Sequence, residues 1–147
     1  MTVELREIRE ADVPILFAQQ ADPEANAMAA FPARDEPAFR EHLARVLAEP
    51  ANIIRAVVSG NAVVGQIGSW DDDGARNVGY WIGREHWGNG YATAALRRLI
   101  TIDTTRPLWA HIADHNVGSK RVVERCGFVL DRSVQEDVLE RIYVLRA

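Results

Sequence analysis

An apolar segment that runs through a glycine turn into an amphipathic helix constrains this chain more than any other feature. The apolar segment is Val78–Ile82, the turn is Gly88-Asn89-Gly90, and the helix is expected over Tyr91–Asp103. Glycine has no Cβ atom, so its backbone adopts positive φ readily and approaches a ligand closely. The first N–H groups of a helix lack partners within the helix and bind anions. The pattern therefore predicts a phosphate cradle at a strand–helix junction.

Two familiar phosphate-binding loops do not fit this turn. A dinucleotide-binding G-x-G-x-x-G motif counted from Gly88 and Gly90 would place glycine or alanine where Thr93 stands. Its acidic residue should follow a second strand, whereas Asp103 lies at the end of the same helix. A Walker A loop needs a Gly-Lys-Ser/Thr sequence, which the turn lacks. An isolated G-x-G also occurs in ordinary strand–helix turns, so other motifs must decide its role.

Local patterns predict the remaining elements. Alternating or β-branched apolar runs indicate strands over residues 2–8, 53–59, 62–70, 108–112, 128–130 and 138–145. Capping residues followed by apolar residues at helical spacing indicate helices over residues 12–20, 35–49 and 116–126. Residues 21–34 break both patterns and are expected to form a loop or a broken helix.

Turn chemistry and apolar spacing predict how these elements join. Gly60-Asn61 suits a tight hairpin, and residues 71–74 are expected to form the next turn. In helix 35–49, one face is expected to carry Phe39, Leu43, Val46 and Leu47. Two strand–helix–strand units favour parallel crossovers, whereas the hairpins are antiparallel. The sequence thus predicts a mixed α/β fold, with a mostly antiparallel sheet of about seven strands and helices on both faces.

Composition limits the classes of protein that this chain can represent. With 147 residues, 48% of them hydrophobic, we expect a single domain over residues 1–147. The net charge of −4 argues against binding to nucleic acid or anionic membranes, because that affinity comes mainly from Lys and Arg. Without a signal peptide or an apolar run near the ~20 residues of a membrane span, we expect a cytoplasmic protein. The lone Cys126 excludes an internal disulfide and a multi-cysteine zinc site, and we expect no metal.

Two motifs later in the chain indicate the role of the glycine turn. Asn116-x-x-Ser119 and the run from Glu124 to Phe128 follow the turn at a specific spacing. With the strand, the turn and the Ala-rich helix, they resemble the two core motifs of the GNAT superfamily of N-acetyltransferases. The run from Tyr80 to Thr93 resembles most the branch that contains ribosomal-protein N-terminal acetyltransferases. Glu85 departs from the Gln or Arg usual at its position, and we expect it to point away from the bound anion.

The resemblance implies acetyl-CoA as cosubstrate, wedged between two splayed parallel strands at the centre of the sheet. Main-chain groups of Ile82 and Gly83 would face the pantetheine arm, and Asn116 would contact it from the next helix. The pyrophosphate would be held by the backbone N–H groups of Trp87, Gly88, Asn89, Gly90, Tyr91 and Ala92. Lys120, Arg121 and Arg125 would either face the ribose phosphate or form a solvated helix face.

The sequence indicates the catalytic residues less specifically than the residues that would bind CoA. Ser119 matches the position that donates a proton to the departing thiolate in some similar enzymes, although serine there is also an ordinary capping residue. Candidates for the general base are His111, Glu136 and Asp137, each of which also suits a solvated position. For the acceptor pocket, the candidates are the 21–34 segment and Trp70, Trp81 and Trp87, with packing in the core as the alternative for the tryptophans.

The sequence therefore favours an acetyl-CoA-dependent N-acetyltransferase in which an amine attacks the thioester directly in a ternary complex. A peptide α-amine is the favoured acceptor and a small-molecule amine the second. Presenting a neutral amine of pKa about 8 at pH 7 costs roughly 1.4 kcal/mol, against roughly 4.6 for a lysine amine. The alternative is a catalytically silent acyl-CoA-binding sensor or interaction domain. The oligomeric state stays open.

Overall fold

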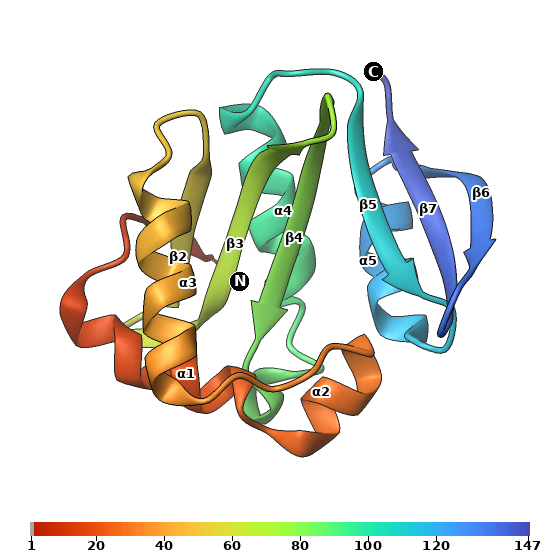
Figure 1. Cartoon of the computed structure of the whole chain (residues 1–147). Coiled ribbons are helices and arrows are strands. Elements are labelled where there is room, and N and C mark those ends of the chain that lie inside the picture. The colour runs from red at the N-terminus through yellow and green to blue at the C-terminus, as the bar shows by residue number, and fades with distance from the viewer. Residues whose placement is uncertain (1) are drawn as a thin grey trace.

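The computed structural model describes residues 2–147 and consists of one mixed sheet with helices on both faces (Figure 1). The strands are β1 (Glu4–Arg6), β2 (Ile53–Ser59), β3 (Ala62–Asp72), β4 (Ala75–Ile82), β5 (Leu108–Ala113), β6 (Val129–Gln135) and β7 (Leu139–Leu145). The helices are α1 (Val13–Gln20), α2 (Pro23–Ala29), α3 (Glu36–Ala48), α4 (Tyr91–Ile102) and α5 (Val117–Arg125), with 3-10 turns η1 (Glu10–Asp12) and η2 (Arg84–His86). The strand order is β1-β2-β3-β4-β5-β7-β6.

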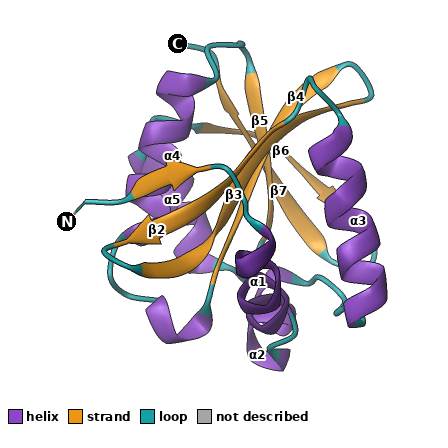
Figure 2. Cartoon of the chain, turned by 90° about the vertical axis from the view of Figure 1, so that its left-hand side faces the viewer, coloured by secondary structure: helices purple, strands orange, loops and turns teal. Residues whose placement is uncertain are grey.

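Two apolar clusters hold the layers together. Seen edge-on, α4 and α5 cover one face of the sheet while α1 and α3 cover the other (Figure 2). The larger cluster joins α4 and α5 to the sheet through residues such as Leu96, Leu99 and Val123, none of which is exposed. The smaller one forms around Leu16 of α1 and Phe39 of α3. Burial of these side chains is the main force that fixes the helices on the sheet.

The sheet is antiparallel except between β4 and β5, which confirms the predicted fold class. These two strands pair only where Arg76 meets Leu108 and Asn77 meets Trp109, and they diverge beyond that point (Figure 1). The second strand–helix–strand unit gives no adjacent parallel pair, because β7 lies between β5 and β6. Within residues 2–147 the sheet therefore has one parallel pair, β4 and β5, whose strands separate toward their C-terminal ends.

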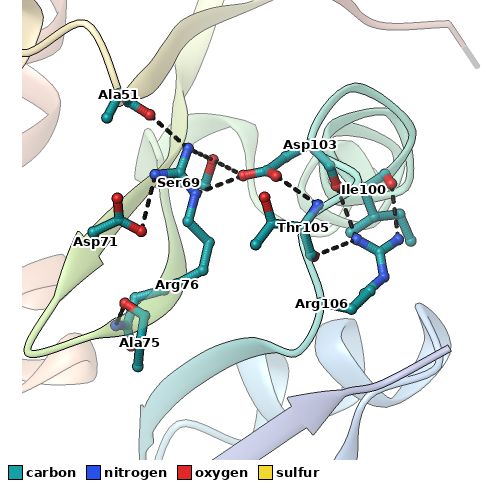
Figure 3. Close-up of polar contacts among 10 residues, drawn as sticks. Ala51, Ser69, Asp71, Ala75, Arg76, Ile100, Asp103, Thr105 and Arg106 are labelled. Carbon is teal, nitrogen blue, oxygen red and sulfur yellow. Dashed lines mark hydrogen bonds and ion pairs between the residues drawn. The ribbon is translucent and has the colours of Figure 1, made fainter.

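A buried polar network holds the closed end of this splay (Figure 3). Arg76 donates from Nε to Asp103 Oδ2 at 2.8 Å, and Ser69 Oγ donates to the same oxygen at 2.6 Å. Arg76 also reaches the Ala51 carbonyl at 2.8 Å, and the Thr105 N–H donates to Asp103 Oδ1 at 3.0 Å. Burial alone would raise the pKa of Asp103, but these hydrogen bonds outweigh it and lower the pKa to about 2.

Three local expectations need correction. Leu47 is 43% exposed, because the buried stripe of α3 follows Phe39 and Leu43 and leaves Leu47 at its edge. The turn predicted over residues 71–74 is shorter, since β3 continues to Asp72 and only Asp73 and Gly74 take positive φ. Strand β6 is longer than predicted and extends to Gln135 because it pairs along β7.

The 21–34 segment is a broken helix, one of its two expected forms. Asp22 caps α2 by accepting a hydrogen bond from the Ala25 N–H at 3.0 Å. The helix ends at Ala30, whose φ of 52° is left-handed. In Figure 1, α2 lies across the end of the sheet toward which β4 and β5 open.

Candidate active site

A cavity of about 390 Å³ lies at the open end of the splay, between β4, α2 and the first turns of α4 and α5. Eight of the ten residues predicted to bind the cosubstrate line it: Ile82, Trp87, Gly88, Gly90, Tyr91, Ala92, Asn116 and Ser119. A smaller cavity of about 100 Å³ continues between β4 and β5 and shares Ala29, Tyr80, Asn116 and Ser119 with the first. We call the two cavities together the slot.

The glycine turn has the backbone that its sequence predicts. Gly88 and Gly90 both have φ of 79°, in the left-handed region that L side chains rarely adopt. Gly90 is the N-cap of α4 and provides no side chain to satisfy the first N–H groups of that helix. These N–H groups carry the positive end of the helix dipole at the edge of the slot. The turn is therefore suited to hold an anionic group.

The first turn of α5 is built differently. Asn116 caps it by accepting a hydrogen bond from the Ser119 N–H at 3.2 Å. The cap leaves the Ser119 hydroxyl facing the slot, so that α5 contributes side chains there while α4 contributes backbone donors. The two helix termini thus offer different chemistry to a bound molecule.

Hydrogen bonds within the protein already use some of the backbone groups that the resemblance assigned to the pantetheine arm. The Gly83 N–H donates to the Val64 carbonyl at 2.9 Å, and the Trp87 indole donates to the Ile82 carbonyl at 2.9 Å. Since hydrogen-bonded pairs alternate along an antiparallel ladder, the N–H groups of Tyr80 and Ile82 point away from β3 toward the splay. They are the strand donors open to a ligand.

Gly83 and Asn89 are absent from the lining of the cavity. Gly83 lies against Gln19 of α1, where an added Cβ would come within 2.9 Å of that side chain. Asn89 folds the turn itself, donating from its side chain to the His86 carbonyl at 3.0 Å. Both residues shape the loop from outside the slot.

Tyr80 is a slot residue that the sequence did not single out. Its O–H donates to Ser119 Oγ at 2.7 Å, joining β4 to α5 across the slot. Burial, partly offset by the Ser119 hydrogen bond, raises the pKa of Tyr80 to about 12. Its position on the same strand face as Val78 and Ile82 is the signal that would have pointed to it.

Of the three candidate bases, only His111 lines the slot. Its Nδ1 lies 3.5 Å from Glu140 Oε1 on the neighbouring strand β7. Glu136 and Asp137 are exposed in the β6–β7 turn and line neither cavity. His111 and the α4 cradle therefore lie in different parts of the slot, with Ser119 between them.

Helix α2 forms the wall of the slot opposite α4, through Ala25, Met28 and Ala29. It is tied at one end by Arg84, which pairs with Asp22 at 2.7 Å and Glu24 at 3.3 Å. Near its other end the Ala27 carbonyl lies 2.9 Å from His115 Nε2. These contacts fasten α2 to both sides of the splay.

Some of the tryptophans and charged residues considered for the site line the slot, and others lie outside it. Trp81 and Trp87 line the slot, whereas Trp70 packs against Gly79. Glu85 lines a separate groove beside α1 and stays outside the slot. Of the basic residues on α5, Arg125 lines the slot and Lys120 pairs with Asp114 at 3.2 Å.

The model of the "Acetyltransferase (GNAT) domain" matches residues 2–129 of the chain. The chain belongs to the GNAT acetyltransferase family. A search of curated protein sequences finds no match. This acetyltransferase contains no helix, within residues 2–147, long and apolar enough to cross a membrane.

Solved structures share the fold of this GNAT domain along its whole length. A GNAT-family acetyltransferase from Bacillus anthracis aligns with a TM-score of 0.85 and 16% identity, covering 99% of this chain and 95% of the other. RimL, a ribosomal α-N-protein acetyltransferase in complex with CoA, aligns at 0.84 and 19% identity, covering 99% and 94%. Spermidine N-acetyltransferase from Vibrio cholerae, in complex with CoA and spermine, aligns at 0.83 and 18% identity, covering 98% and 95%. Two of these structures hold CoA, in line with the predicted cosubstrate.

Proposed function

We propose that this GNAT domain transfers an acetyl group from acetyl-CoA to a primary amine, with a peptide α-amine as the favoured acceptor. The observation that supports this most is the slot itself, which has anion-binding helix N–H groups at one end and His111 in its other part. In this arrangement the pyrophosphate of CoA lies on the α4 cradle. The thioester then reaches the region between Tyr80 and Ser119, where the two cavities meet.

The chemistry assigns one role to each end of the slot. The amine nitrogen bonds to the thioester carbonyl carbon, the C–S bond breaks, and the amine proton passes to His111. The Glu140 carboxylate favours the proton on His111 Nδ1, which leaves Nε2 as the acceptor. The sulfur leaves as a thiolate to which the Ser119 hydroxyl donates. The strand N–H groups of Tyr80 and Ile82 are placed to polarise the carbonyl oxygen.

The charges of the slot favour a monoamine over a polycation. Among residues 2–147, no Asp or Glu lines either cavity. Glu140 contacts His111 and gives only one carboxylate beside the slot. A polyamine would enter with several positive charges and find only this one carboxylate to compensate them, and desolvating unpaired charges is costly. The lower cost of presenting a neutral α-amine at pH 7 adds to this preference.

Acetyl transfer is tested by mixing the protein with acetyl-CoA and a panel of short peptides, spermine and an aminoglycoside, while following thiol release. We expect turnover with peptides that carry a free α-amine and slower turnover with polycations. Faster turnover with spermine would contradict the acceptor assignment. Tight CoA binding with no turnover on any acceptor would favour the silent acyl-CoA sensor instead.

The cradle itself is tested by Gly88→Glu, which places a bulky anion where the pyrophosphate is proposed to lie. We expect CoA affinity, measured by calorimetry, to fall at least a hundredfold. Gly74→Glu is the matched control, because Gly74 has the same φ of 79° and the same open space around its Cβ position in a distant hairpin. Equal loss of CoA affinity in both variants would show that backbone strain, and not the cradle, is responsible.

A further inference from the structure

The Tyr80–Ser119 hydrogen bond joins two residues that lie 39 positions apart in the sequence. Both side chains line the two cavities of the slot where these meet, so the pair lies where the thioester is proposed to react. Tyr80 stands on β4, at the strand face that packs toward α4 and α5, and Ser119 is in the first turn of α5. The contact therefore depends on the splay that brings α5 beside β4.

The direction of this hydrogen bond determines whether the Ser119 hydroxyl proton is available to a bound molecule. A phenol is a better hydrogen-bond donor than an aliphatic hydroxyl, and the pKa of Tyr80, raised by burial, keeps its proton in place at neutral pH. Ser119 Oγ therefore accepts from Tyr80. A serine hydroxyl has only one proton, and with Oγ engaged as an acceptor that proton remains for a group in the slot.

We propose that Tyr80 is a positioning residue that orients the Ser119 hydroxyl toward the departing thiolate of CoA. This role rests on the proposed acetyl transfer and on Ser119 as the group that contacts the sulfur. The Tyr80 O–H fixes the rotamer of Ser119 and polarises its O–H bond, because hydrogen bonds in a chain strengthen one another in a buried site. No proton leaves Tyr80 in the step. The sulfur carries the electron pair of the broken C–S bond and accepts the Ser119 hydrogen bond.

The first measurement needs only bound CoA and no turnover. The pKa of the CoA thiol in the complex is followed by the ultraviolet absorbance of the thiolate as pH is raised. If the pair stabilises the thiolate, Ser119→Ala raises this thiol pKa by about one unit, a tenfold change in ionisation. Tyr80→Phe also raises the thiol pKa, by an amount that corresponds to a several-fold change in ionisation. The double variant Tyr80→Phe/Ser119→Ala matches Ser119→Ala alone, because Tyr80 acts through Ser119.

Tyr143→Phe is the matched control. Tyr143 is also buried and its O–H donates to Glu124 at 3.1 Å, but it lines neither cavity. Its variant loses a comparable hydrogen bond and is expected to bind CoA with the wild-type thiol pKa. Turnover gives a second readout, in which Tyr80→Phe lowers kcat several-fold and leaves KM for acetyl-CoA unchanged.

The outcomes separate this inference from the proposed function. A thiol pKa in Tyr80→Phe equal to that of Tyr143→Phe overturns the positioning role and leaves acetyl transfer intact. A double variant whose thiol pKa lies well above that of Ser119→Ala overturns it as well, since Tyr80 would then act independently. Failure of the wild-type protein to bind CoA overturns the proposed function and the positioning role together.

Discussion

At the scale of single residues, the slot separates His111, the proposed base, from Ser119, the residue proposed to stabilise the leaving sulfur. His111 reaches it from β5 and is paired with Glu140, whereas Ser119 reaches it from α5 and is paired with Tyr80. Each functional side chain thus has a partner on another element that restricts its orientation. Such second contacts are what hold reacting groups in a productive geometry.

Replacement of His111 by Gln tests the base. Gln keeps a polar side chain but accepts no proton, so kcat/KM should fall by about 10²–10⁴-fold. His42→Gln, on α3 and outside the slot, is the control for loss of a histidine. A kcat/KM of His111→Gln equal to that of His42→Gln would remove His111 as the base.

At the scale of elements, α4 and α5 differ in whether a capping side chain accepts a hydrogen bond from the first N–H groups of the helix. The first N–H groups of α4 have no side-chain partner because Gly90 carries no capping side chain, whereas in α5 the Asn116 side chain accepts from the Ser119 N–H. An uncapped terminus gives up stability that a capped one keeps. In this family member the open terminus borders the cavity and is the place where the proposed ligand would compensate.

Removal of the α5 cap tests its double role. Asn116→Ala should lower the free energy of unfolding by about 1 kcal/mol, measured by urea denaturation, and should also weaken CoA binding. Asp35→Ala removes a comparable cap from α3, where Asp35 accepts from the Ala38 N–H at 2.9 Å, far from the slot. The two variants should be similarly destabilised. Similar CoA affinities in the two would argue that Asn116 serves the helix alone.

At the scale of the whole molecule, the buried network around Asp103 joins β3, β4 and the end of α4 at the closed end of the splay (Figure 3). Beyond Asn77 no pairing joins β4 to β5, so the width of the slot is set by this end and by α2 across the other. The strands β4 and β5 therefore separate at one end only, and the buried Arg76–Asp103 pair holds the other end closed.

Because of the network around Asp103, the free energy of unfolding depends on pH in the acid range. The pKa of Asp103 is lowered to about 2 in the folded protein, so the network's contribution is complete above pH 4 and is lost as pH falls through 2. Asp103→Asn should therefore lower the free energy of unfolding at pH 7 by about 2 kcal/mol, since the buried Arg76 keeps its charge and is left with only the exposed Asp71, at 3.4 Å, as a carboxylate partner. The gap between variant and wild type should narrow near pH 2. Asp72→Asn, at an exposed position, is the control, and equal urea midpoints for all three proteins at pH 7 would contradict the prediction.

The sequence alone determined the features that depend on neighbours in the chain. The positive φ at Gly88 and Gly90, the cap at Asn116 and the hairpin at Gly60-Asn61 are local choices of the backbone, so a few residues are enough to predict them. Together with the later motif, they led to the GNAT family that the family model shows.

Only the tertiary structure decided which distant groups meet. Insertion of β7 beside β5 placed Glu140 against His111, and the splay placed Tyr80 against Ser119. The pairing of β3 with β4 gave the Gly83 N–H to Val64 and left those of Tyr80 and Ile82 for a ligand. These outcomes depend on strand order and register, which are fixed by burial of the whole core and not by any short stretch of sequence.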